Sequence, residues 1–519
     1  MPAESEGPLR ERFGDLLTRL QHQYASMQIL VLSGLAAGAD LLAAEVAVER
    51  GIAVLGCLPL PKDDYENDFT PKQLARFRRI LPRCWDVLTV GTSSKRNDNY
   101  VDVAGFIAYY CHVLVAFWDG LPARGAGGTA DVVELRKGGL PGIVGDALVA
   151  YVPDVGPVFH IVTPRRDQPL PAGCFSLNES YPERTRWKTK SSNDAADVGR
   201  LEFENAIARL GQLNRDLERE AVPGEPDRLA ALCKRTDAVA NRLQRKSLRS
   251  LQSLYAITAL AGAAQIVLPT DGSFGIPSWA GIGARIAFLV VAFIVFAIAK
   301  HADYENRYQD YRAIAEGLRV QHAWCSTGLR NRLVEASYMQ MQQSELSWIR
   351  LALRTAYLIT GAGSAASDDA PARTASSRWV ENQLEYYELA GKREEQFLIS
   401  AKRSMATAAV LGIGISAVAA VFAWRANDLH ALSYWVTMPI ALGGMLALLI
   451  RFYVEQRGVA EHARRYQHMF TVFDAGLRRL RENAGDPQKV LEQLGHEALS
   501  EHAEWLILHR ERPLTFVHT

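Results

Sequence analysis

Two glycine-rich stretches in the first quarter of the chain carry residue types that bind phosphate. The first, Ser-Gly-Leu-Ala-Ala-Gly-Ala-Asp at 33–40, follows an apolar run of strand length at 27–32 and opens an amphipathic helix. The second, at 127–129, follows a strand-like run at 112–118 and precedes another helix. Such turns aim backbone N–H groups and a helix N-terminus at one point, which favours an anion. The glycines could also serve only to make tight turns.

The predicted ligand-binding residues are grouped around these two turns. Backbone N–H groups of 34–38 and 127–129 would hold phosphates, and the Thr129 hydroxyl would donate a further hydrogen bond. We expect Asp40 to cap its helix, with a contact to a ribose hydroxyl as the alternative. Asp119, at the end of a strand, either meets a sugar or starts a turn. The full candidate set is Ser33, Gly34, Ala37, Gly38, Asp40, Tyr65, Arg96, Tyr100, Asp119, Gly120, Gly127, Gly128 and Thr129.

Tyr65, Arg96 and Tyr100 belong to that set because they are loop residues that could stack on a base or pair with a phosphate. The ordinary alternative is that each is a surface residue.

The elements that position these residues alternate between strand and helix patterns, which predicts a doubly wound α/β fold. In such a sheet the ligand crevice lies at the carboxyl ends of the strands, where both glycine turns fall. Further strands are expected at 52–58, 85–90 and 158–163, and helices at 8–20, 71–81, 99–111 and 129–137.

The composition excludes several classes of function. With 58 Lys and Arg against 57 Asp and Glu, the net charge of +1 gives no electrostatic reason to expect nucleic-acid binding. The six cysteines are scattered without a CxxC pair, and the twelve histidines form no HExxH motif, so we expect reduced cysteines, no metal site and no cofactor.

The second half of the chain contains four long apolar runs, at 250–270, 280–299, 404–424 and 429–450. Each is long enough to cross a hydrocarbon core of about 30 Å, so we expect four transmembrane helices joined to long cytosolic helices. Lys and Arg gather on one side of these spans. The positive-inside rule therefore predicts an inner-membrane, multi-pass protein with both termini cytosolic.

Two features of the spans bear on transport across the membrane. Polar groups are sparse, and Gln265 and Arg285 are the candidates for lining a pore, although Arg285 could simply extend to the interface. Small residues such as those at 443–444 permit close helix packing and predict a homo-oligomer. The two halves also share Arg-Tyr-Gln at 307–309 and 465–467, which suggests a duplication.

The soluble part resembles a SLOG domain over about residues 10–136. Ser33-Gly34-Leu-Ala-Ala-Gly38-Ala-Asp40 and Gly127-Gly128-Thr129 match the two phosphate-facing turns of that Rossmann-like fold. The fold normally begins with a strand and a glycine loop, whereas this chain starts almost directly at the first helix. Whether a native first strand, and with it part of the pocket, is missing stays open.

The region from about 201 to 513 is similar to SLATT membrane effectors. The resemblance rests on paired spans followed by Tyr311-Arg312-Ala-Ile-Ala-Glu316-Gly-Leu-Arg319, on Trp379-Val-Glu-Asn-Gln383 and on Glu501-His-Ala-Glu-Trp505. It implies a nucleotide-sensing effector that breaches membranes in bacterial conflict systems. The implied ligand is ADP-ribose, NAD or a cyclic nucleotide, and the implied effector is an oligomeric pore or ion channel in antiviral defence or stress.

Two other functions remain open. Arg124 and Glu134 flank the second turn, as catalytic residues do in LOG-type phosphoribohydrolases, so a membrane-tethered nucleotide hydrolase is the second hypothesis. A passive membrane scaffold for a nucleotide-binding domain is the third. The expected organisation is an α/β domain at 1–180, a linker at 181–198, a first membrane half at 199–360, a linker at 361–377 and a second membrane half at 378–519.

Overall fold

The computed structural model describes most of the chain and divides it into two compact units. Unit 1 comprises 1–232 and 333–366, and unit 2 comprises 233–332 and 367–519. The described residues are 2–138, 156–181, 192–220, 227–268, 277–327, 346–360, 369–426, 429–482 and 486–510, except 92, 124–126, 166–167 and 169, together with 329, 334 and 338.

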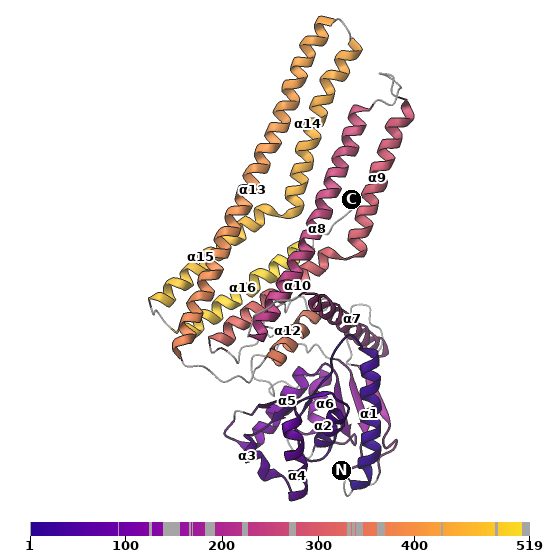
Figure 1. The fold of residues 1–519 in the computed structure, drawn as a ribbon, viewed down its shortest axis with the longest axis vertical. Helices are drawn as coiled ribbons and strands as arrows, with labels where there is room; N and C mark the ends of the chain where they lie inside the picture. Colours follow the sequence, from indigo (N-terminus) through magenta and orange to yellow (C-terminus); the bar gives the residue numbers. More distant parts are fainter. Residues whose placement is uncertain are drawn as a thin grey trace. The chain divides into compact units, whose positions relative to one another are not determined.

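Unit 1 is built on two short sheets (Figure 1). In the first, β1, β2 and β3 are parallel and neighbours in that order. In the second, β4 is parallel to β5, and β6 is antiparallel to β5. The strands are β1 (Leu30–Ser33), β2 (Ala53–Leu58), β3 (Asp86–Thr89), β4 (Leu114–Trp118), β5 (Val158–Val162) and β6 (Leu177–Ser180).

Helices of unit 1 cover these strands and share a core with them. Val31 of β1 and Val115 of β4 pack into the same apolar cluster as Leu17 and Leu41, which joins the two sheets through buried side chains. The helices are α1 (Glu6–Gln23), α2 (Ala39–Glu49), α3 (Lys62–Tyr65), α4 (Pro71–Ile80), α5 (Arg96–Tyr110) and α6 (Thr129–Gly138).

The predicted strands and helices of this region are present within a few residues of their expected ends. The parallel pairing of β1 to β3 and of β4 with β5 is consistent with a Rossmann-like part. The sequence patterns missed β6 and α3, which are only four residues long. Too few residues repeat in such short elements for a period to be recognised.

Unit 1 also includes two helices that the sequence placed beyond its boundary at residue 180, α7 (Ser192–Glu218) and α12 (Ser347–Thr360). Arg354 of α12 is 1% exposed and donates a hydrogen bond of 2.8 Å to the Tyr109 carbonyl of α5. The Arg354 guanidinium also lies 4.0 Å from the Tyr109 ring centroid. A helix far along the sequence therefore completes the N-terminal unit.

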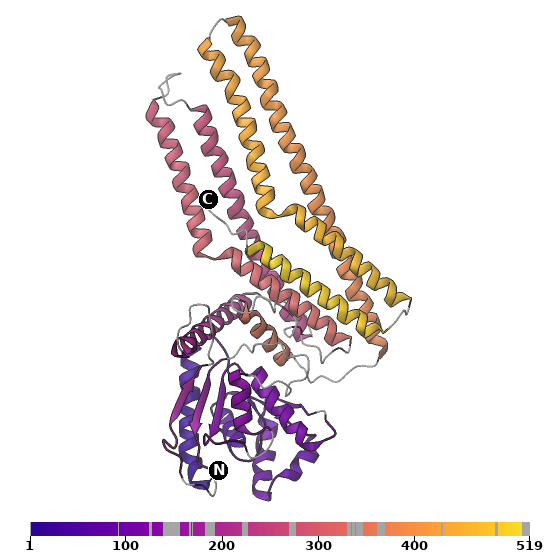
Figure 2. The same cartoon turned by 180° about the vertical axis from the view of Figure 1, so that it is seen from behind.

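Unit 2 consists of long helices, and two pairs of them form the hairpins α8–α9 and α13–α14 (Figures 1 and 2). Helix α13 begins at Asp369, so it includes the second half of the linker predicted at 361–377. The helices are α8 (Arg228–Val267, almost all in unit 2), α9 (Ser278–His301), α10 (Tyr304–Ser326), α13 (Asp369–Ala426), α14 (Leu429–Arg457), α15 (Val459–Arg481) and α16 (Pro487–Arg510).

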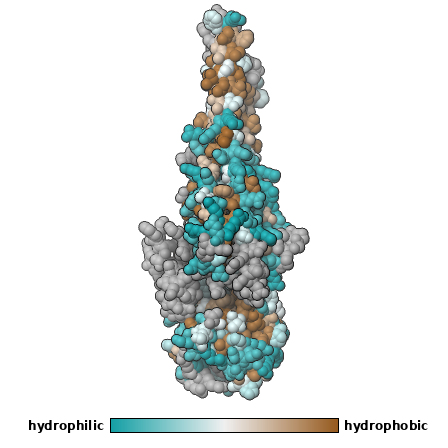
Figure 3. All heavy atoms as spheres, turned by 90° about the vertical axis from the view of Figure 1, so that its left-hand side faces the viewer, coloured by the Kyte–Doolittle hydropathy of each residue, from teal (hydrophilic) through white to brown (hydrophobic). Residues whose placement is uncertain are grey.

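The four hairpin helices, with α9 continued into α10, are each long and apolar enough to cross a membrane. Large apolar side chains on them face outward: Phe293 is 58% exposed and Phe422 is 69% exposed. Figure 3 shows hydrophobic residues gathered over the upper part of the α13–α14 hairpin. Outward-facing apolar surface of this length is what a bilayer would cover, so the chain has the character of a membrane protein.

Candidate functional site

The first glycine turn connects β1 to α2 and holds a backbone shape that few residues adopt. Gly38 has a φ of 114° and Leu35 a φ of 51°. The Ser33 hydroxyl accepts a hydrogen bond of 3.1 Å from the Leu35 N–H and donates one of 3.1 Å to the Asp40 carbonyl. Ser33 therefore braces the turn from inside.

Asp40 does not cap α2, contrary to the expectation from sequence. Gly38 is the capping residue, and Asp40 lies in the first helical turn. Burial raises the pKa of Asp40 to about 6, and a hydrogen bond with the Ala36 backbone opposes that rise. A Cβ added at Gly34 would lie 3.0 Å from Asp40 Oδ2, so this carboxyl group supports the turn directly.

Tyr65, Arg96 and Tyr100 are not loop residues, contrary to the expectation from sequence. Tyr65 is the last residue of α3, Arg96 and Tyr100 lie on α5, and each side chain is already engaged. Tyr65 is only 2% exposed and donates a hydrogen bond of 3.0 Å to the Gly34 carbonyl. Arg96 pairs with Asp68, and the Tyr100 hydroxyl hydrogen-bonds to the same carboxylate. The contacts of Arg96 and Tyr100 join α5 to Asp68. A ligand would have to displace Asp68 to bind Arg96 or Tyr100.

The second glycine turn lies against the same helix as the first. A Cβ added at Gly127 would lie 3.0 Å from the Tyr100 carbonyl oxygen of α5, and one added at Gly34 would lie 3.5 Å from Val103 Cγ1. Gly127 has a φ of 78°, and its N–H donates to Asp131 Oδ2 at 2.9 Å. A phosphate bound at this N–H would therefore compete with the Asp131 carboxylate.

The remaining predicted site residues differ in their exposure to solvent. Ala37 of the first turn and Thr129 of the second are exposed, whereas Gly128 is half-buried. Arg124 lies outside the described residues, and Glu134 is exposed on α6.

Asp119 starts the turn after β4, as one of its two predicted roles requires. Its carboxylate accepts a hydrogen bond of 3.1 Å from the Leu121 N–H and pairs with Arg165 Nε at 2.6 Å. Gly120 follows with a φ of 83°, a conformation that favours glycine. Arg165 comes from the segment after β5, so this ion pair ties the ends of two neighbouring strands together.

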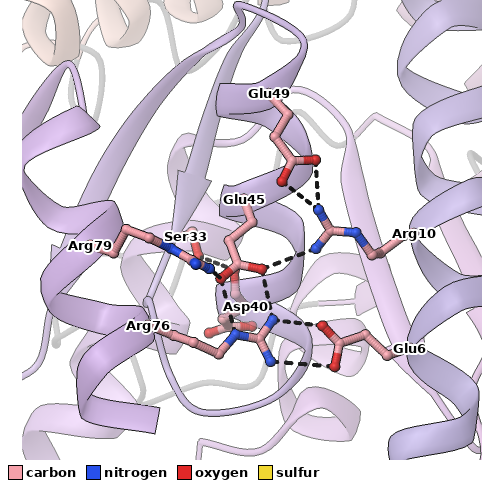
Figure 4. Close-up of polar contacts among 8 residues, drawn as sticks. All are labelled: Glu6, Arg10, Ser33, Asp40, Glu45, Glu49, Arg76 and Arg79. Carbon is pink, nitrogen blue, oxygen red and sulfur yellow. Dashed lines mark hydrogen bonds and ion pairs between the residues drawn. The ribbon is translucent and has the colours of Figure 1, made fainter. Parts of the chain in front are cut away.

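A charged cluster on α2, which the sequence analysis missed, fixes the helix that follows the first turn (Figure 4). Glu45 is 5% exposed and accepts hydrogen bonds of 2.7–3.0 Å from three arginines, Arg10, Arg76 and Arg79. Burial by itself raises the pKa of Glu45, but these arginines outweigh that effect and lower it. The partners come from α1 and α4, so no local motif could have revealed the cluster.

The two pore candidates lie on the two helices of the α8–α9 hairpin. Gln265 is exposed on α8. Arg285 of α9 donates a hydrogen bond of 3.0 Å to the Leu268 carbonyl, and so it satisfies a backbone group just after α8.

Glycines allow the two helices of the α13–α14 hairpin to pack closely against each other. A Cβ added at Gly443 would lie 2.5 Å from the Ala408 carbonyl oxygen, and one added at Gly412 would lie 2.7 Å from the Pro439 carbonyl oxygen. Backbones that approach this closely are typical of small-residue packing between membrane helices. These two glycines therefore pack α13 against α14 within one chain, while Gly414 and Gly444 face open space.

Comparison with known proteins recognises one region of the chain. The family model described as "Protein of unknown function (DUF4231)" matches residues 235–330. This region holds most of α8 and all of α9 and α10, which is the first hairpin with the helix that follows it. The searches of curated proteins and of solved structures found no match. The match thus delimits a domain around the first hairpin.

Proposed function

We propose that this chain is a membrane effector that senses a nucleotide-derived ligand and opens an oligomeric pore or channel. The ligand class is ADP-ribose, NAD or a cyclic nucleotide, and the setting is a bacterial defence or stress system at the inner membrane. The observation that carries the proposal is the approach of both glycine turns to the N-terminal half of α5, in a chain with four helices fit to cross a membrane.

The turns suit phosphate because they present backbone rather than side chains. The first turn leads into α2, whose N-terminus carries the partial positive charge that favours an anion. At the second turn, a phosphate that replaced Asp131 on the Gly127 N–H would release the first turn of α6. Ligand binding is thereby linked to a local rearrangement.

Long unbroken helices offer a way to transmit such a change within unit 2. Helices α8 and α13 each run without a break from a charged segment into an apolar one. A rotation at the charged end would reach the apolar end, since an α-helix is stiff over this length. Gating then requires that the ligand bind the open and closed states with different affinity.

Leakage from liposomes tests this proposal. The full chain, reconstituted in liposomes, is titrated with NAD, ADP-ribose and cyclic nucleotides while dye and ion release are followed and the nucleotides are recovered. Ligand-dependent release with intact nucleotide supports the effector. Cleavage of the nucleotide without release supports the membrane-tethered hydrolase. If neither release nor cleavage occurs, the scaffold is supported.

A matched pair of glycine variants tests whether ligand-dependent release depends on the second glycine turn. Gly127→Val places a side chain against the Tyr100 carbonyl in a backbone conformation that disfavours it. Gly51→Val imposes the same backbone strain at a φ of 71°, with no atom within 4 Å of the added Cβ, and it lies just after the C-terminal end of α2, outside both turns. We expect release to be lost in the first variant and kept in the second, with circular dichroism confirming that both remain folded.

A further inference from the structure

A polar cavity of about 570 Å³ lies inside unit 2, lined by residues of α8, α10, α13, α14, α15 and α16. Its volume is in the range of sites that hold small molecules, roughly 300–1,000 Å³. Tyr308 of α10 and Tyr466 of α15 both line it, and each is the tyrosine of an Arg-Tyr-Gln triplet. The cavity is thus built from equivalent positions of the two similar halves.

The cavity is lined by residues of the helical segments that continue all four predicted spans. Leu251 of its lining lies in the first span, Glu305 follows the second, Glu394 precedes the third and Gln456 follows the fourth. A molecule bound there would contact the charged continuation of every membrane helix of the chain. Occupancy of the cavity is therefore placed to act on the packing of the spans.

The arginines that line the cavity largely have acidic partners within it. Arg312 pairs with Asp237 at 2.7 Å, Arg319 pairs with Glu316, and Arg457 pairs with Glu394 at 3.3 Å. The fourth, Arg393, is exposed to solvent. An incoming anion would have to break these ion pairs to bind.

The carboxyl groups that line the cavity outnumber the arginines that line it. Five carboxyl groups face four arginines, and no described residue donates a hydrogen bond to Glu501 Oε1 or Glu394 Oε2, both of which are shielded from solvent. Burial, followed by the charge of Glu316, raises the pKa of Glu501 to about 7. The pKa of His502 is lowered well below its ordinary value, first by burial and then by Arg312 and Arg319, so this histidine adds no positive charge.

Aromatic rings complete the lining around Glu501. Tyr387 and Tyr466 lie with their ring centroids 6.2 Å apart, and those of Tyr308 and Trp505 are 6.3 Å apart. Aromatic faces attract cations through their quadrupole and attract anions poorly. An ammonium or guanidinium ion binds to carboxylate oxygens and to the faces of aromatic rings. Both kinds of group line this cavity.

We infer that this cavity is a binding site for a small organic cation, with the Glu501 carboxylate as its main partner. The cation donates hydrogen bonds to Glu501 Oε1, and its alkyl part packs on the tyrosine and tryptophan rings. Binding supplies to Glu501 Oε1 the donor that none of the described residues provides. The site is separate from the glycine turns of unit 1 in residues and in ligand class.

Calorimetric titration of the full chain in nanodiscs tests the site with agmatine and putrescine as the probes. We expect one cation to bind per chain, and saturating agmatine to raise the melting temperature of the protein. If neither probe binds the wild-type chain, the inference is wrong. If ADP-ribose binds and displaces agmatine from the cavity, the assignment to a cation is overturned in favour of a nucleotide.

Two variants of α16 provide the matched control. Glu501→Gln removes the charge at nearly constant shape, and we expect it to weaken agmatine binding by about tenfold or more. Glu504 is three residues away on the same helix, has a 67% exposed side chain and pairs with Arg465, so Glu504→Gln should leave binding within about twofold. Equal binding by Glu501→Gln and the wild-type chain would overturn the site. Glu316→Gln, a second variant facing Glu501, should also weaken binding.

Discussion

Glu45 in unit 1 and Glu501 in unit 2 are carboxylates shielded from solvent, yet their surroundings shift the pKa in opposite directions. Glu45 meets three arginines, and its pKa is lowered. Glu501 Oε1 meets no donor among the described residues, and the pKa of Glu501 is raised to about 7. Burial opposes the charged form in both places. The difference therefore comes from the partners that the tertiary structure supplies.

The comparison separates a structural acid from a candidate binding acid. A carboxylate whose acceptor capacity is filled by arginines can stabilise a fold but has little left to offer a ligand. A buried carboxylate oxygen without a hydrogen-bond donor lowers the stability of the fold. Such groups are common at binding sites, where the ligand supplies the missing donor. We therefore expect stability and ligand binding to respond oppositely to mutation of the two residues.

The largest expected effect is loss of stability in Glu45→Gln. The variant leaves three arginines around a neutral side chain, and we expect unit 1 to lose about 3 kcal/mol of unfolding free energy. Hydrogen exchange of α2 peptides in the full chain measures this loss. Glu49→Gln is the control. Among the described residues Glu49 pairs with Arg10 alone, and its side chain is 55% exposed, so the variant should cost less than about 1 kcal/mol. Equal losses would show that the Glu45 cluster has no special role.

Acid should change the contributions of Glu45 and Glu501 to stability in opposite directions. The pKa of Glu45 lies below its ordinary value of 4.5, so its contribution is complete above pH 4.5 and is lost as the pH falls further. The pKa of Glu501 lies above that value, so its penalty grows as the pH rises from 4.5 towards 7. Asp40 of α2 also has a raised pKa, and the lowered pKa of His502 opposes the effect of Glu501 within α16. On lowering the pH from 8 to 5, we therefore expect the protection of α16, taken relative to intrinsic exchange rates, to rise more in the wild-type chain than in Glu501→Gln, which keeps His502. Equal changes in the two chains would contradict the raised pKa of Glu501.

A smaller effect, of opposite sign to the first, is expected for Glu501→Gln. The amide carries no charge to desolvate, so at pH 8 we expect unit 2 to become more stable by about 1 kcal/mol, with slower exchange in α16. The variant should also lose the part of the pH response of α16 that Glu501 contributes, while the part due to His502 remains. A clear loss of stability would mean that Glu501 has a stabilising partner, and the comparison with Glu45 would fail.

The smallest effect belongs to Arg79→Gln. The Arg79 side chain is 66% exposed, and Glu45 keeps Arg10 and Arg76 after the change. We expect a loss of no more than about 1 kcal/mol by thermal denaturation. A loss as large as that of Glu45→Gln would show that the three arginines act as one unit.

Much of the architecture followed from patterns within short windows of sequence. The glycine turns after β1 and β4 lie where the apolar runs and glycines predicted them, and the four apolar runs became four helices fit for a membrane. The role of Asp40 was predicted incorrectly. A helix cap depends on the backbone angles of one residue, and Gly38 took that position because it can adopt a φ of 114°.

What the sequence by itself determined is the order and type of the elements, because hydrophobic period and turn residues act locally. Only the tertiary structure decided that α12 belongs to unit 1, that Glu45 meets three arginines, and that Glu501 Oε1 meets no donor among the described residues. These outcomes depend on which distant side chains meet. The energy of a buried charge is set by those neighbours and by exclusion of water, and neither is encoded in the spacing of residues along the chain.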